Sequence, residues 1–172
     1  MEPQARTGPQ LGYRGNVRRM RLLLVTDANV IFAATLRDST TRRLLLRGEV
    51  LPVAPRMVIA EIEKHIREIS ARNFLPIEMN RKVLRLLANH ILLLPVRAYK
   101  RFLLEAHMMI GRRDLSDVPY IAVALAVDAD GIWSHDADFA AQNRFRVWST
   151  AQLRELLSRD PCEYRGDREA RV

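Results

Sequence analysis

The sequence contains little cysteine and no long apolar run, and each absence excludes a class of protein. Cys162 is the only cysteine among 172 residues, so no disulfide can form within the chain and a reducing compartment is expected. The longest apolar runs, such as 120–127, are far shorter than the ~18 residues of a membrane span. Residues 1–20 carry arginines but no apolar block, unlike a secretory signal. We therefore expect a soluble, cytoplasmic protein with no membrane partner.

Several catalytic signatures are missing as well. The sequence has no glycine-rich loop for phosphate, no Ser-His-Asp arrangement and no reactive-cysteine context. The histidines show no metal-ligand spacing, and we interpret them as surface or capping residues. They are His65, His90, His107 and His135.

Lysine is scarce, yet the chain is strongly basic. It contains 25 arginines and only three lysines, and its formal net charge is +8. A positive field attracts nucleic acid, and arginine pairs well with phosphate oxygens. A codon bias toward arginine would produce the same excess, so the charge suggests a nucleic-acid partner without establishing it.

The central part of the chain has the composition of one globular domain. Hydrophobic residues make up 48% of the sequence, enough to form a core. Residues 1–20 and 159–172 are charged and irregular. We interpret them as a flexible basic N-terminal arm and a flexible charged tail, and we predict a folded domain over residues 21–158.

Within this domain, short apolar runs alternate with helical patterns. The predicted strands are 22–26, 51–54, 91–94, 131–134 and 146–148. The predicted helices are 29–36, 40–47, a helical pattern from Met57 through Ile69, 76–88, 98–110, 118–127 and 150–157. The alternation predicts an α/β fold, with a parallel sheet covered by helices on both faces. In helix 98–110, we interpret the methionines as filling the core.

Acidic residues lie where such a sheet binds ligands, beyond the carboxyl ends of its strands. Asp27 follows the first strand, and Asp136 and Asp138 follow the fourth. Glu61 lies early in the helix after the second strand, and Asp117 opens the buried helix 118–127. Each alone is explained as a helix cap or a first-turn acid. Their coincidence at one edge of the sheet predicts a shared site.

Clustered carboxylates require a counter-charge. Two of them ~4 Å apart repel by about 4 kcal/mol at an effective dielectric constant near 20. Oxygen ligands without histidine or cysteine favour Mg²⁺ or Mn²⁺ over zinc, as one ion or two. Such an ion binds substrate phosphate and activates water, which predicts hydrolysis of phosphodiester bonds.

At these residues the sequence resembles the PIN domain, the fold of VapC-type toxin nucleases, PilT N-terminus-like proteins and related RNA-processing enzymes. The matching stretches are LLLVTDANVIFA (22–33), APRMVIAEIEKH (54–65), DLSDVPYIAVAL (114–125) and IWSHDADF (132–139), with VWSTAQLREL closing the domain. The resemblance implies a three-layer α/β/α sandwich whose parallel five-stranded sheet has the order 3-2-1-4-5. It also implies metal-dependent endoribonuclease activity on RNA, a homodimer or higher homo-oligomer, and an antitoxin partner if the protein is a toxin.

Carried over by position, the resemblance implies that Asp27, Glu61, Asp117 and Asp136 form the catalytic quartet. Asp27, Asp117 and Asp136 would bind the principal ion, while Glu61 would bind a second ion or orient the attacking water. The position after the fourth strand corresponds to either Asp136 or Asp138, so both are retained.

Further residues are expected around this quartet. Asp114 could extend the metal site, and Asn29 and Ser134 could orient its ligands. Several arginines could grip the RNA backbone, although exposed charge explains them equally well. They are Arg112, Arg113 and Arg56, with Arg42 and Arg43 as weaker candidates.

Two other functions fit the same residues. A PIN-fold module could bind RNA or protein without cutting it, but such a module would be expected to have lost carboxylates. A phosphoesterase acting on DNA would have the same acidic cluster. The helical pair 57–89 is longer than in compact toxins, and the basic arm and tail extend beyond the domain. Both a toxin and an RNA-processing nuclease are therefore retained.

Overall fold

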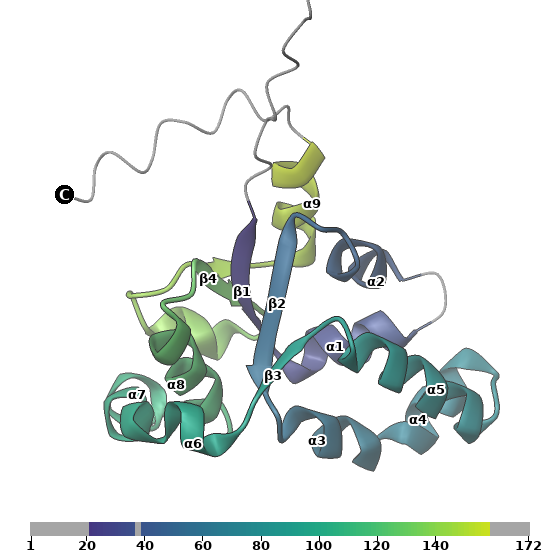
Figure 1. Cartoon of the computed structure of the whole chain (residues 1–172), viewed down its shortest axis with the longest axis horizontal. Helices are drawn as coiled ribbons and strands as arrows, with labels where there is room; N and C mark the ends of the chain where they lie inside the picture. The colour runs from purple at the N-terminus through teal and green to yellow at the C-terminus, as the bar shows by residue number, and fades with distance from the viewer. Residues whose placement is uncertain (1–20, 37–38, 159–172) are drawn as a thin grey trace, which may run out of the picture.

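A computed structural model of the chain describes residues 21–36 and 39–158. Five strands in these residues form one sheet in the order β3-β2-β1-β4-β5, and every neighbouring pair is parallel. The strands are β1 (Leu22–Thr26), β2 (Val50–Pro55), β3 (Leu92–Leu94), β4 (Gly131–Trp133) and β5 (Val147–Trp148). The expected sheet and strand order are confirmed (Figure 1). The predicted arm, 1–20, and tail, 159–172, lie outside the described residues.

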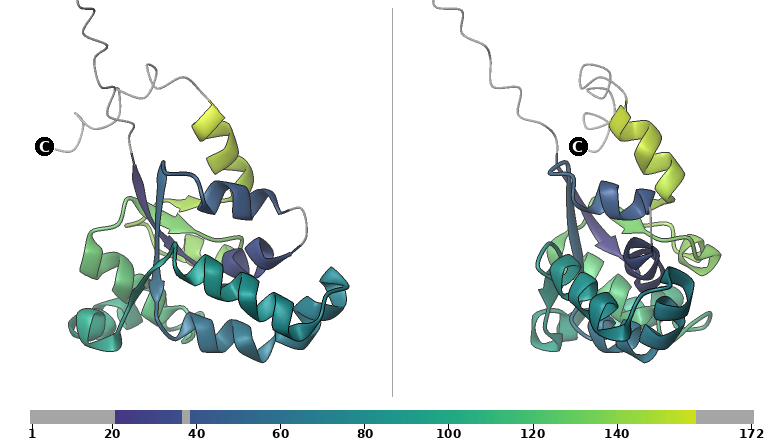
Figure 2. Two further views of the ribbon diagram at one scale, coloured as in Figure 1. Left: turned by 45° about the vertical axis from the view of Figure 1, so that its right-hand side comes forward. Right: turned by 90° about the vertical axis from the view of Figure 1, so that its right-hand side faces the viewer.

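Helices flank both faces of the sheet. The α-helices are α1 (Ala28–Thr35), α2 (Thr40–Leu45), α3 (Val58–Lys64), α4 (Ile66–Asn73), α5 (Ile77–Ala88), α6 (Val96–Tyr99), α7 (Leu103–Ile110), α8 (Val118–Val127) and α9 (Thr150–Ser158). Two 3₁₀ turns are η1 (Lys100–Phe102) and η2 (Ala137–Ala141). Helices α6, α7 and α8 lie on one side of the sheet, and α1, α2 and α5 lie on the other (Figures 1 and 2). In the residues that the structure describes, no helix combines the length and the apolar character of a membrane span.

The apolar runs of β1 and α8 reflect burial on several sides. In β1, every residue except the half-buried Leu23 is buried, as expected for a strand covered on both faces. In α8, Ile121–Leu125 is buried without interruption because the helix lies between the sheet and the α6–α7 segment. These two elements carry Asp27 and Asp117 at their ends, so a rigid core positions both carboxylates.

Two predicted helices are interrupted in the structure. The pattern from Met57 ends at Lys64, and α4 begins only at Ile66, because His65 turns the chain with φ −96° and ψ 8°. The predicted helix 98–110 is divided into α6, η1 and α7, since Tyr99 has φ −124° and ψ 0°.

The interpretation of both methionines in this segment as core residues is wrong for Met108. Its side chain is 72% exposed, and so is that of Leu104 one turn earlier. Ala106 and Ile110 form the buried face of α7, and Met109 packs partly against the core. Residues 104 and 108 therefore share the opposite, outer face of the helix.

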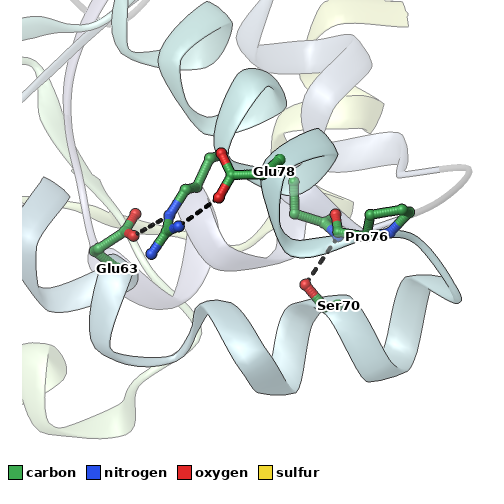
Figure 3. A network of polar contacts seen from close by, with 6 residues as sticks. Glu63, Ser70, Pro76 and Glu78 are labelled. Atoms are coloured by element: carbon green, nitrogen blue, oxygen red, sulfur yellow. Dashed lines mark hydrogen bonds and ion pairs between the residues drawn. The ribbon is translucent and has the colours of Figure 1, made fainter.

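Buried amides connect α4 to α5 and to α1. Asn73 Nδ2 donates to Asn80 Oδ1 at 2.6 Å and to the Thr35 carbonyl oxygen at 3.0 Å. Asn80 Nδ2 in turn donates to Ser70 Oγ at 3.1 Å (Figure 3). Both amides are buried, and each has polar partners, so the hairpin is attached to α1 in one arrangement.

A surface ion-pair network joins α3 to α5. Arg81 Nε lies 2.6 Å from Glu63 Oε1, and Arg81 Nη1 lies 2.7 Å from Glu78 Oε1 (Figure 3). Exposed pairs of this kind contribute about 0.2–1 kcal/mol each, so they support the position of α3 rather than determine it.

Candidate functional site

The central strands β1 and β4 place two polar residues opposite each other at the carboxyl edge of the sheet. Thr26 of β1 pairs with Trp133 of β4. Asp27 and Ser134 are the residues that directly follow these two strands. Ser134 Oγ donates a hydrogen bond to Asp27 Oδ2 at 2.8 Å, and both side chains are buried. Ser134 thus holds the Asp27 side chain in place, and its role beside a metal ligand stays a prediction.

Asp27 occupies the cap position of α1 without capping the helix. Its side chain forms no capping hydrogen bond to the helix backbone. Burial raises the pKa of Asp27, and the negative charge of Asp136 adds to this, while the hydrogen bond from Ser134 and the backbone N–H groups of Ala28 and Asn29 lower it. These polar neighbours do not outweigh the burial, which still disfavours the charged form of Asp27.

Asp117 presents the clearest electrostatic problem in the structure. It precedes α8 without forming a capping hydrogen bond, and its side chain is buried. Its Oδ2 atom has no hydrogen-bond partner among the described residues. Burial, followed by the charges of Asp114, Asp27, Asp136 and Asp138, raises the pKa of Asp117 to about 7. Carboxylates from three separate segments thus converge on this residue, and a cation would satisfy the unpaired oxygen.

Asp136 and Asp138 have different surroundings. The Asp136 backbone N–H donates to Ser134 Oγ at 2.9 Å, which ties Asp136 to the residue that binds Asp27. One Asp136 oxygen also accepts from the Asp138 N–H at 2.8 Å, so the capping interpretation applies to it in part. Asp138 faces outward, 3.4 Å from Arg113 Nη1.

Asp114 stabilises its own turn. Its Oδ1 accepts hydrogen bonds from the Ser116 N–H and from Ser116 Oγ, both at 2.7 Å. These bonds lower the pKa of Asp114. It contributes charge near Asp117 while its local role is structural.

Glu61 reaches the site from α3 and is bound by a residue that the sequence analysis passed over. Tyr120 donates its hydroxyl hydrogen to Glu61 Oε2 at 3.2 Å. The tyrosine is only 2% exposed, and its ring meets Phe139 edge to face with centroids 6.2 Å apart. Burial, followed by the charges of Glu61 and Asp27, raises the pKa of Tyr120. The only sequence signal was a hydroxyl inside the otherwise apolar stretch 118–127.

Among the candidate RNA-binding arginines, Arg113 contacts the acidic residues through Asp138. Arg112 and Arg56 are exposed. Arg42 instead donates to the carbonyl oxygens of Ala34 and Leu36 at the end of α1. Its role there is structural, which weakens it as a candidate for RNA contact.

Two hollows flank the acidic residues. One of about 60 Å³ lies between α1 and α3 and includes Asn29 and Glu61 in its wall. The other, of about 330 Å³, lies around His135 and the start of α9. His135 Nε2 lies 2.9 Å from Thr150 Oγ1 and accepts from the Thr150 N–H, so the capping prediction is confirmed for this histidine.

The donor chemistry fits a hard divalent cation. The converging groups are carboxylates, and the buried Asp117 oxygen lacks a donor. Within residues 21–36 and 39–158, no three acidic, histidine or cysteine side chains are close enough to hold an ion as they stand.

An all-parallel sheet in the order β3-β2-β1-β4-β5, flanked by helices and with carboxylates at its carboxyl edge, is consistent with a PIN-like α/β/α fold. The family model of the PIN domain matches residues 25–158. The chain belongs to the PIN domain family, whose members are generally nucleases that use divalent metal ions and act on nucleic acid. A search of curated proteins found no match.

Proposed function

We propose that the protein is a Mg²⁺- or Mn²⁺-dependent endoribonuclease. The observation that carries this proposal is the buried Asp117 carboxylate: its Oδ2 atom has no hydrogen-bond partner among the described residues, and burial, with neighbouring carboxylates, raises its pKa to about 7. A structural cap would be hydrogen-bonded, whereas a metal ligand awaiting its ion would have these properties.

In this proposal Asp27, Asp117 and Asp136 hold the ion. Asp138 and Asp114 lie at the edge of the metal site and extend it. The bound ion would supply an activated water and shield the charge on the phosphoryl oxygens. Ser134 keeps Asp27 and Asp136 in position through its two hydrogen bonds. Because these ligands come from different segments, the site depends on the complete sheet.

Glu61 orients the attacking water, and Tyr120 orients Glu61. The water oxygen bonds to phosphorus, the bond to the 3′ oxygen breaks, and that oxygen leaves with a proton. The products are a 3′-hydroxyl and a 5′-phosphate. Arg113 lies beside Asp138 and can turn to a substrate phosphate.

The substrate, the compartment, the oligomeric state and the biological role are also part of this proposal. RNA is the substrate, and the protein acts in the cytoplasm as a homodimer or higher oligomer. It serves either as an RNA-processing nuclease or as a toxin with an antitoxin partner. The acidic residues do not distinguish RNA from DNA, so a phosphoesterase for DNA is the alternative that the assay must exclude.

The test is cleavage of end-labelled single-stranded and structured RNAs, with matching DNAs, in Mn²⁺, in Mg²⁺ and in chelator. We expect RNA cleavage that requires the metal. Replacing a residue that only hydrogen-bonds a metal ligand typically lowers activity by roughly 10- to 100-fold. Asp27→Asn removes a proposed ligand itself, so it should lower the cleavage rate by more than that. Glu105→Gln is the matched control, because this half-buried acid on α7 pairs only with Arg144 in the contacts described. Cleavage that survives full chelation would refute the proposal.

A further inference from the structure

The hollow between α1 and α3 extends away from the acidic residues toward two rings. Figure 1 shows the two helices close to each other at the carboxyl edge of β2. The residues that line the hollow are Ala28, Asn29, Phe32, Glu61, Ile62 and His65. Phe32 follows Asn29 by three positions on α1, and His65, at the end of α3, follows Glu61 by four. Each ring thus lines the hollow beside a polar residue of the same segment.

The rings form a small aromatic cluster with a cation. Phe32 and His65 meet edge to face, with centroids 6.5 Å apart and an interplanar angle of 80°. The guanidinium carbon of Arg72 lies 5.6 Å from the centroid of Phe32, and Arg72 also pairs with Glu68 at 2.8 Å. Phe32 packs partly against the core, while His65 is exposed. A half-buried ring and an exposed ring therefore line the hollow, and the Arg72 guanidinium packs against the Phe32 ring.

We propose that this hollow is a subsite for an unpaired base of the RNA, on the nucleotide next to the bond that is cut. Unstacked bases bind to aromatic and guanidinium planes, and their edges form hydrogen bonds with polar side chains. His65 supplies an exposed ring plane at the rim of the hollow, Phe32 lines the hollow that receives the edge of the base, and Asn29 supplies an amide. The inference rests on the proposed function, because Glu61 belongs to both the hollow and the acidic group.

The size of the hollow restricts how a base binds. A volume of about 60 Å³ accommodates about four waters at roughly 15 Å³ each, so it admits the edge of a planar ring and not a whole nucleotide. Binding of this kind tolerates any base but requires that the base be unpaired. The subsite therefore selects single-stranded segments over duplexes.

The first experiment follows the ring protons of His65 by NMR in the full chain carrying Asp27→Asn, which binds without cutting. The ligands are adenosine 5′-monophosphate and ribose 5-phosphate, which differ only in the base. We expect the nucleotide to shift the His65 signals through its ring current while ribose 5-phosphate leaves them in place. Equal shifts with both ligands, or no shift with either, would overturn the subsite. Assignment comes from the spectrum of His65→Ala.

The second experiment measures binding of a fluorescent single-stranded RNA of ten nucleotides to the same Asp27→Asn background. Adding His65→Ala or the conservative Phe32→Leu should weaken binding by about fivefold or more, the effect of losing one stacked base. His90→Ala is the matched control, because His90 is exposed and precedes β3 at the opposite edge of the sheet. Variants that bind as tightly as this control would refute the proposal.

These measurements separate the two proposals. Binding is read in a variant that does not cut, whereas the nuclease proposal is read from metal-dependent cleavage by the wild-type chain. Absent cleavage would refute the nuclease alone. A duplex of the same sequence should bind more weakly than the single strand, and a DNA strand of that sequence shows whether the subsite requires the 2′-hydroxyl.

Discussion

At the scale of single residues, Asp117 makes the stability of the protein depend on pH. Its pKa rises from 3.8 to about 7 on folding, so the folded protein keeps a proton that the unfolded chain has lost. Between these two values the folded state binds more protons, and the free energy of unfolding therefore falls as the pH rises. We expect a loss of about 2–4 kcal/mol between pH 5 and pH 8 without divalent ions.

Urea unfolding in chelator at the two pH values measures this loss. Asp27 also has a raised pKa and contributes with the same sign, so Asp117→Asn should flatten the dependence without abolishing it. Adding Mg²⁺ at pH 8 should restore stability, since the ion binds only the folded state. A wild-type dependence no steeper than that of Asp117→Asn would contradict the assignment.

The Tyr120 hydroxyl should matter for turnover more than for folding. Tyr120→Phe keeps the ring contact with Phe139 and removes only the hydrogen bond to Glu61. Hydrogen bonds to charged groups are worth about 1.5–3 kcal/mol, so kcat should fall at least tenfold while KM stays nearly constant. Tyr99→Phe is the control, because it removes the hydroxyl of another buried tyrosine, on α6. Equal kinetics for the two variants would argue against a positioning role.

Individual acidic residues could be located from the sequence because they follow apolar strands or open helices. Asp27, Asp117 and Asp136 satisfy that rule, and the structure brings their charges together. Tyr120 could not be located, since a tyrosine in a buried helix usually fills space. Its function depends on Glu61, which is 59 positions away in the chain.

At the scale of elements, the α4–α5 hairpin depends on buried amides. Asn80→Ala removes the acceptor of Asn73 Nδ2 and the donor to Ser70 Oγ. Unsatisfied buried groups of this kind cost about 1–3 kcal/mol each, and we expect a total loss of about 2–3 kcal/mol. Asn89→Ala, at the exposed end of α5, should change stability by much less.

Thermal unfolding and hydrogen exchange can test this together. The loss should appear first as faster exchange in α4 and α5, while β1 and β4 stay protected. Uniformly faster exchange would show that the hairpin and the sheet unfold as one unit.

The breaks in two predicted helices show what periodicity does not reveal. Ile62, Ile66 and Ile69 keep helical spacing across the turn at His65, because all three still face the same core. The apolar pattern records which side chains are buried and is insensitive to one non-helical residue between them. The apolar pattern of residues 98–110 likewise did not reveal the break at Tyr99, which separates α6 from η1 and α7.

At the scale of the whole molecule, the net charge of +8 predicts salt-sensitive binding to RNA. Each phosphate neutralised on a single strand contributes about −0.7 to the slope of log affinity against log salt. For a footprint of about three phosphates, affinity should fall roughly 20-fold between 50 and 200 mM salt. Titrations of labelled RNA with the Asp27→Asn variant measure the slope. Binding that is indifferent to salt would mean that the arginine excess has no role in substrate contact.

The architecture as a whole was predictable because strands and helices alternate along the chain. A parallel sheet followed from that alternation, and the strand order followed from resemblance to the PIN domain. The distribution of exposed apolar side chains was not predictable, as Met108 shows. Which face of a short helix meets the core depends on how its neighbours pack.

The strand order has a consequence for synthesis of the protein on the ribosome. β1 is the first strand made, but its neighbour β4 comes from residues more than a hundred positions later, and Ser134 and Asp136 follow β4. A nascent chain that lacks these residues cannot assemble the carboxylates. If the protein cuts RNA as proposed, a nascent chain acquires this activity only after the segment through Asp136 has been synthesised and has paired with β1.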